Sequence, residues 1–211
     1  MNISVKKLIS KIVIGLVSIL LVFIVYRIIF FTYCNYYDNI SFHPTSDVVI
    51  INDLFTKMFL IRTSKGFIAI DTGFDDAILR KGLAYNNIKP EDVQAVFITH
   101  SDIDHQNAVE VFTKAVFYFP KKELEMVENK IPRFGYFPFF INHIYLKNYI
   151  TVNDNDSLRI DNRNVKCISL PGHTLGSMGY IIDGRYLFSG RVAFSRFVSE
   201  RPASHVREPV T

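Results

Sequence analysis

The residues best suited to chemistry are two histidines and two aspartates that the sequence places within six positions. They lie in the stretch FITHSDIDHQNA of residues 97–108 and are His100, Asp102, Asp104 and His105. On extended backbone, residues two apart point the same way, so the first three side chains can converge where a strand ends. Imidazole and carboxylate are ligands that Zn²⁺ and Fe²⁺ accept, and a cation would stabilise the crowded charges. The alternative is a polar surface loop that follows a strand.

A second histidine stretch makes the metal interpretation much more specific. His173 lies in PGHTLGS, a Pro/Gly turn that follows an apolar run. Alone, a histidine in such a turn is more often a turn residue than a ligand. Together the two stretches predict a metal site whose ligands come from two separate loops.

The elements that must position these loops alternate between strands and helices. Strands are predicted over DVVIIND (47–53), MFLIRTS (58–64), FIAID (67–71), VQAVFIT (93–99), AVFYF (115–119), SLRI (157–160), VKCISL (165–170), MGYIID (178–183) and YLFSG (186–190). Helices are predicted over DDAILRKGLAYNNI (75–88), through NAVEVFTK (107–114) and over KKELEMVE (121–128). The first metal stretch begins where VQAVFIT ends, and this nearly all-apolar run is typical of a strand buried on both faces. Asp183-Gly184 predicts a hairpin turn between the last two strands. The pattern predicts one mixed α/β domain.

Residues 12–33 predict an uncleaved membrane anchor. About 20 apolar residues span the hydrocarbon core of a bilayer, and the only charge in this segment is Arg27, near its end. No Ala-x-Ala cleavage site occurs nearby. Lys6, Lys7 and Lys11 precede the segment, so the positive-inside rule predicts a cytoplasmic N-terminus and an extracytoplasmic C-terminal domain.

Composition restricts the class of partner. The net charge is +4, but three of the positive charges flank the apolar segment, and no basic run with interleaved aromatics occurs elsewhere. Nucleic acid is therefore not an expected partner. The expected partners are a small-molecule substrate and, through residues 12–33, the membrane. The two cysteines form no disulfide framework.

The sequence resembles the metallo-β-lactamase fold family. THSDIDH (99–105) resembles the family signature Thr-His-x-His-x-Asp-His, with Asp102 at the second histidine position. Asp71-Thr72-Gly73 matches the Asp-Thr-Gly turn upstream, and PGHTLGS matches the segment that carries the third metal-binding histidine. Order and spacing agree over residues 47–190. The resemblance implies an αββα sandwich with the metal site at one edge of the two sheets. It also implies hydrolysis of an ester, lactone, amide or phosphoester by a metal-bound hydroxide.

The resemblance also implies roles for individual residues. The first metal site would be formed by His100, Asp102 and His173, and the second would be served by Asp104 and His105. Asp104 would also orient the attacking water.

A further carboxylate, Asp71, would not bind the metal but would fix the geometry of the residues that do. Zn²⁺ is the expected cofactor. Iron is an alternative because diiron branches of the family carry an acidic residue at the position of Asp102.

The sequence also departs from the family pattern. Where the family has Gly-Asp, with an aspartate that bridges two metals, this chain has Gly190-Arg191. The last family histidine is missing, and His205 is too close to the preceding strand to replace it. We therefore expect one metal per chain, and we keep open a catalytically impaired domain that binds a ligand or partner. The expected organisation is an N-terminal tip and anchor (1–34), a metallo-β-lactamase-like domain (35–190) and an atypical tail (191–211).

One aromatic segment has no assigned role. IPRFGYFPFFINHIY (131–145) is rich in Phe and Tyr and contains two prolines that oppose a regular helix. Packing in the core is the default interpretation. The alternatives are a flap at the mouth of the site or a surface that leans on the bilayer.

Overall fold

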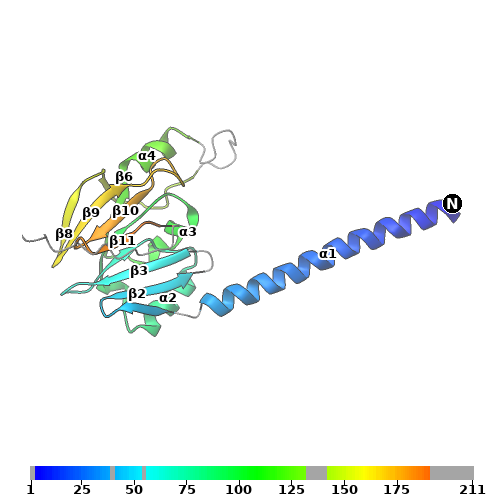
Figure 1. Ribbon diagram of the computed structural model, residues 1–211, viewed down its shortest axis with the longest axis horizontal. Helices are drawn as coiled ribbons and strands as arrows, with labels where there is room; N and C mark the ends of the chain where they lie inside the picture. Colours follow the sequence, from blue (N-terminus) through cyan, green and yellow to red (C-terminus); the bar gives the residue numbers. More distant parts are fainter. Residues whose placement is uncertain (1–2, 39–40, 54–55, 132–141, 191–211) are drawn as a thin grey trace, which may run out of the picture.

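The structure is a computed structural model that describes residues 3–38, 41–53, 56–131 and 142–190 (Figure 1). Arg191, His205 and the rest of the tail lie outside the described residues, as do residues 132–141 of the aromatic segment.

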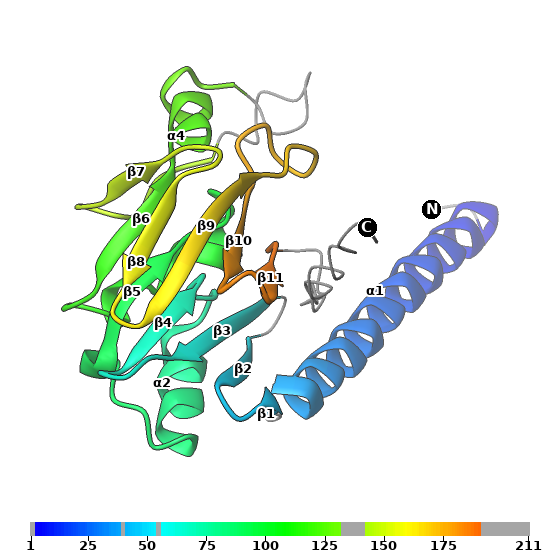
Figure 2. The same ribbon diagram turned by 60° about the vertical axis from the view of Figure 1, so that its left-hand side comes forward.

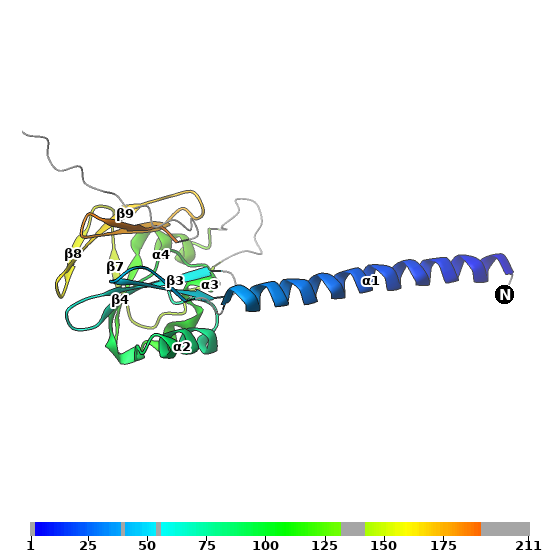
Figure 3. The same cartoon turned by 60° about the horizontal axis from the view of Figure 1, so that its bottom comes forward.

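The N-terminal helix α1 (Ile3–Asp38) projects away from the rest of the molecule (Figures 1 and 3). Its stretch Val5–Phe30 is long and apolar enough to cross a membrane, and none of it is buried against the rest of the protein. A signal sequence can have the same length and apolar composition. The helix is therefore a candidate membrane span.

Seven strands form the first sheet, in their order along the chain: β1 (Phe42–Thr45), β2 (Val48–Asp53), β3 (Thr56–Arg62), β4 (Phe67–Ile70), β5 (Val93–Phe97), β6 (Val116–Pro120) and β7 (Ile150–Val152). Strands β1 to β4 pair antiparallel, and β4 to β7 pair parallel. The short strands β1 and β7 were not predicted from the sequence.

Four antiparallel strands form the second sheet, in the order β11-β10-β9-β8 (Figure 2). They are β8 (Ser157–Ile160), β9 (Arg163–Ser169), β10 (Met178–Ile182) and β11 (Tyr186–Phe188). The predicted hairpin between β10 and β11 is confirmed. Asp183 and Gly184 have φ values of 53° and 66°, the two positive values that a tight type I′ turn requires.

The two sheets pack face to face, and helix α2 covers the outer face of the seven-stranded sheet (Figure 3). Strand β5 is buried on both faces, as its sequence predicts. Phe97 faces the four-stranded sheet, where its ring stacks on Tyr118 and meets Tyr180, whereas Val96 and Ile98 face the helices. Burial of each such large side chain stabilises the fold by about 1.5–3 kcal/mol. The loop after β5 therefore starts from one of the most firmly packed elements.

The helices around the sheets are short. They are α2 (Asp76–Tyr85), α3 (Ile103–Gln106) and α4 (Lys121–Glu128), with 3-10 turns η1 (Pro90–Asp92) and η2 (Asn107–Val111). The side chain of Asp75 caps α2 by accepting from the backbone N–H groups of Ala77 and Ile78.

The helix predicted through residues 107–114 forms only in part. A 3-10 turn, η2, covers Asn107–Val111 directly after α3, and the backbone has non-helical torsions at Gln106 and Ala108. The backbone N–H groups of Asn107 and Ala108 donate to the carbonyl of Gly73, so a tertiary contact replaces the helical hydrogen bonds at this point. The Asp-Thr-Gly turn thereby fixes where α3 ends.

Candidate metal centre

Two loops from different sheets meet at the edge of the molecule. The first ligand loop, residues 98–102, follows β5, and the second, residues 170–177, joins β9 to β10. The N–H of Met178 donates to the carbonyl of Thr99 at 2.9 Å, and the hydroxyl of Tyr180 donates to the carbonyl of Ile98. These bonds fix the position of one loop relative to the other.

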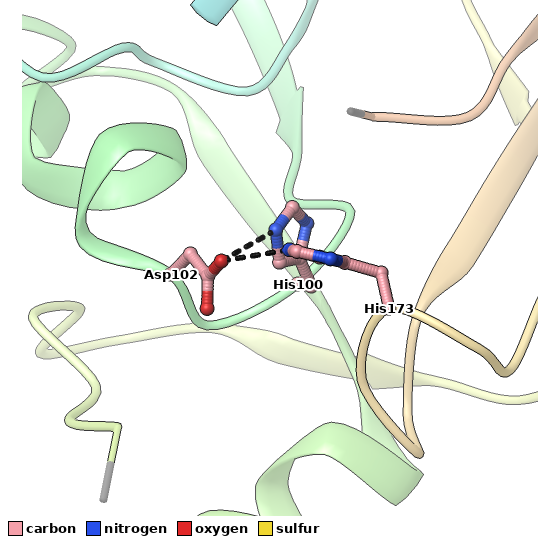
Figure 4. A group of neighbouring side chains, drawn as sticks. All are labelled: His100, Asp102 and His173. Atoms are coloured by element: carbon pink, nitrogen blue, oxygen red, sulfur yellow. Dashed lines mark hydrogen bonds and ion pairs between the residues drawn. The ribbon is translucent and has the colours of Figure 1, made fainter. Parts of the chain in front are cut away.

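The loops bring together His100, Asp102 and His173 (Figure 4). Each of the three side chains offers one possible metal-ligand atom, and these three atoms all lie within 4.8 Å of one another. Oδ2 of Asp102 lies 2.9 Å from Nε2 of His173 and 3.3 Å from Nε2 of His100. His100 and Asp102 are buried, whereas the side chain of His173 is 26% exposed and gives the group an open side. An imidazole–carboxylate–imidazole set of this kind suggests a metal site.

The hydrogen bonds of His100 fit a metal ligand. Oγ1 of Thr99 donates its one proton to Oδ2 of Asp71 at 2.9 Å. Oγ1 of Thr99 must therefore be the acceptor in its 2.9 Å hydrogen bond with Nδ1 of His100. This assigns the proton of His100 to Nδ1 and leaves a lone pair on Nε2. Nε2 is buried without a hydrogen-bond partner among the described residues. A buried acceptor of this kind is costly unless something binds it, and a cation between Nε2 and Oδ2 of Asp102 would satisfy it.

Asp71 is the shared support of this arrangement. Its side chain is fully buried, and it accepts from the N–H of Thr99 at 2.7 Å and from Nδ1 of His105 at 2.7 Å. The carboxylate therefore selects the tautomer of His105 directly and that of His100 through Thr99. In both histidines Nε2 is left with a lone pair, as a metal ligand requires.

His105 and Asp104 lie beside the group of three. The ring of His105 is 4.0 Å from that of His100, centroid to centroid, and its Nε2 is 3.6 Å from Oδ2 of Asp104. Burial lowers the pKa of His105, but Asp71 and the neighbouring carboxylates raise it more, so the pKa lies above its usual value. Oγ1 of Thr56 is 3.4 Å from the same Nε2. The predicted second pair is thus brought together, next to the first group.

One buried carboxylate near the site was missed by sequence reasoning. Glu123, in the first turn of α4, is fully buried. Its Oε1 accepts from the N–H of Ser101 at 2.8 Å and from the Ser101 hydroxyl, and its Oε2 accepts from Oγ1 of Thr174 at 2.7 Å. A Cβ on Gly176 would lie 2.1 Å from the Glu123 nitrogen, so the second ligand loop approaches α4 closely. Glu123 therefore links both ligand loops to one helix.

Two amides were also missed. Gln106 is fully buried and donates from Nε2 to the carbonyls of Ser101 and His143, each at 2.7 Å. Asn142 donates from Nδ2 to Ser101 and Asp102. For Glu123 the sequence does carry a signal: it shares a helix face with Met126 and so lies on the apolar side of α4. Nothing in the local sequence marks Asn142.

Comparison with known proteins agrees with this geometry. The sequence model of the Metallo-beta-lactamase superfamily matches residues 51–207. The chain is 32% identical over 107 residues to a protein of Bacillus subtilis named a probable polyketide biosynthesis zinc-dependent hydrolase, covering 49% of this chain and 40% of that protein. It is 34% identical over 116 residues to a hydroxyacylglutathione hydrolase of Vibrio cholerae, covering 54% and 38%. The chain thus spans about two fifths of the length of these relatives.

Solved structures show the same fold. The subclass B3 metallo-beta-lactamase of Bradyrhizobium japonicum superposes with a TM-score of 0.60 at 19% identity, covering 71% of this chain and 61% of that one. A metallo-beta-lactamase of Cronobacter sakazakii gives 0.60 at 17%, with the same coverage. The predicted mixed α/β metallo-β-lactamase-like fold is confirmed. The chain belongs to the metallo-β-lactamase superfamily.

Proposed function

We propose that this protein is a membrane-anchored, metal-dependent hydrolase that cleaves an ester, lactone, amide or phosphoester. The observation that carries the proposal is the buried Nε2 of His100, which has a lone pair and faces Oδ2 of Asp102 and Nε2 of His173. Three protein ligands and one open coordination position are typical of a catalytic Zn²⁺ site. Relatives named hydrolases support the reaction class.

A bound Zn²⁺ would lower the pKa of water toward about 7 and polarise the bond to be cleaved. His100, Asp102 and His173 would hold it. Asp104 is the residue placed to act on the water, because it adjoins this group and its side chain is 22% exposed. Its Oδ2 would accept a hydrogen bond from the attacking water and direct a lone pair of that water at the substrate.

A single tightly bound metal fits the chain best. A second cation at Asp104 and His105 would lie close to the first and would need bridging anions. The family places an aspartate directly after the glycine that corresponds to Gly190, whereas this chain has Arg191, which stays cationic in a protein. Backbone of Gly190 lies against Thr99, where an added Cβ would be 2.6 Å from Oγ1. Gly190, the residue before Arg191, therefore lies beside the first ligand loop.

The same arginine favours one alternative. If Arg191 neutralises Asp104 or binds an anionic ligand, the domain would hold a metal without turnover and would serve as a ligand- or partner-binding module. Loss of a bridging carboxylate is the specific observation behind this second candidate.

For helix α1 we propose an uncleaved anchor with a cytoplasmic N-terminus. Its candidate span Val5–Phe30 has a mean hydropathy of 2.9. Lysines 6, 7 and 11 lie near its start, and the positive-inside rule then places the metal centre outside the cytoplasmic membrane.

Hydrolysis by the full-length chain in detergent tests the proposal. We expect the Zn²⁺-loaded chain to cleave at least one of a panel comprising a hydroxyacylglutathione thioester, a lactone, a β-lactam and a phosphodiester. Chelation should abolish turnover, and Zn²⁺ should restore it in the wild type but not in the double variant His100→Ala, His173→Ala. Zn²⁺ binding without turnover of any of these substrates would favour the binding module.

A further inference from the structure

Asp102 occupies the N-cap position of helix α3, yet its side chain does not cap that helix. An aspartate at this position normally accepts from the first backbone N–H groups of the helix. Asp102 has the extended torsions of an N-cap residue, with φ −65° and ψ 143°, but makes no such side-chain bond. The direction of its carboxylate is therefore set by contacts outside the helix.

Asn142 makes one of these contacts. Its Nδ2 donates to Oδ1 of Asp102 at 2.9 Å and to Oγ of Ser101 at 2.8 Å. Only the NH₂ group of an amide can donate to a carboxylate, so the chemistry fixes which amide atom faces Asp102. The two oxygens of Asp102 thereby differ: Oδ1 accepts from Asn142, and Oδ2 faces His100 and His173.

The backbone next to Asn142 is held against the first ligand loop. Nε2 of Gln106 donates to the carbonyl of His143 and to that of Ser101, each at 2.7 Å. Oε1 of Gln106 accepts from the N–H of Tyr145 at 3.1 Å. A buried glutamine thus holds residues 143–145 against the first ligand loop, which places Asn142 beside Asp102.

We propose that Asn142 is a positioning residue of the metal centre, which holds Asp102 so that Oδ2 alone is presented to the cation. The inference rests on the metal site proposed above. A carboxylate whose other oxygen already accepts a hydrogen bond binds as a single-oxygen ligand, and loss of such a supporting contact typically weakens metal affinity 10–100-fold. Asn142 thus lets a carboxylate serve where the family uses one ring nitrogen.

Zn²⁺ affinity and the spectrum of bound Co²⁺ test this role in the full-length chain in detergent. Asn142→Leu keeps the number and branching of the side-chain heavy atoms and removes the donor, whereas Asn142→Gln keeps an amide. We expect the leucine variant to bind Zn²⁺ about 10–100-fold more weakly, by competition with a chromophoric chelator. Its Co²⁺ absorption bands should shift, because the coordination of Asp102 changes. The glutamine variant should recover part of the affinity.

Asn148→Leu is the matched control, since Asn148 is an exposed asparagine of the same segment. Its Zn²⁺ affinity should equal that of the wild type. The metal-free Asn142→Leu chain should melt within about 4 °C of the wild type, the shift that about 1 kcal/mol produces in a chain of this size.

Wild-type affinity in Asn142→Leu would overturn the inference, and so would a loss that the glutamine variant shares in full. A fall in metal-free melting temperature beyond the stated range would also overturn it, because Asn142 would then support the fold rather than the ligand. A wild-type chain that binds no Zn²⁺ would refute the metal centre itself. Tight binding by the wild type and by Asn142→Leu alike would refute only the role of Asn142.

Discussion

Replacement of Glu123 by alanine should destabilise the domain and loosen both ligand loops. The substitution removes the acceptor for the Ser101 N–H and for the hydroxyls of Ser101 and Thr174. A buried N–H left without an acceptor costs about 1–3 kcal/mol, and loss of one buried methylene adds about 0.8 kcal/mol. We therefore expect a loss of about 2–4 kcal/mol, which lowers the melting temperature by about 4–16 °C.

Glu123→Gln separates the hydrogen bonds from the shape of the side chain. Its amide oxygen can still accept from Ser101, and the hydroxyl of Thr174 can turn to Ser177, whose Oγ lies 2.7 Å away. The expected loss is about 1 kcal/mol. Glu125→Ala is the control, because Glu125 is an exposed glutamate of the same helix and its loss should cost no more than about 0.5 kcal/mol.

Thermal and urea unfolding of the full-length chain in detergent, with and without Zn²⁺, would measure these differences. If Glu123→Ala costs no more than Glu125→Ala, the carboxylate of Glu123 does not link the two ligand loops. A large loss in stability with unchanged Zn²⁺ affinity would show that Glu123 supports the fold but not the site.

Three further outcomes are expected. Asp71→Asn should weaken Zn²⁺ binding about 10–100-fold, because its single amide oxygen cannot replace both Oδ1, which accepts from the Thr99 N–H, and Oδ2, which accepts from His105; unchanged chelator competition would refute this. Arg163→Met should cost about 2 kcal/mol in urea unfolding, because Arg163 joins Asp47 and Asp183; an unchanged midpoint would contradict it. In intact cells, a membrane-impermeant thiol reagent should label Cys34 and spare Cys167, because Cys167 is buried and burial raises the pKa of its thiol to about 12. Labelling of Cys34 only after lysis would reverse the proposed topology.

The sequence predicted the two ligand loops because local pattern determines them. A short apolar run such as VQAVFIT is typical of a strand buried on both faces, and polar residues that follow such a strand leave the sheet at its edge. The Asp183-Gly184 turn was predictable for a similar reason, since two adjacent residues with positive φ need this type of dipeptide.

Features that depend on distant contacts were not predictable. Helix α3 ends early because the carbonyl of Gly73, some thirty residues upstream, accepts from Asn107 and Ala108. Strand β7 has three residues, too few for a period-two pattern, and exists through its pairing with β6. Asn142 and Glu123 act through partners that lie 40 and 51 positions away. Local spacing carries no record of such partners.

The metal content of the purified full-length chain decides whether His100, Asp102 and His173 form a metal site. After removal of loosely held ions by gel filtration, elemental analysis should find about one zinc or iron per chain, as three converging ligands predict. The double variant His100→Ala, His173→Ala should contain none, while it keeps the melting temperature of the metal-free wild type within about 4 °C. A metal-free wild type under metal-replete expression, or a double variant that retains its metal, would contradict the account.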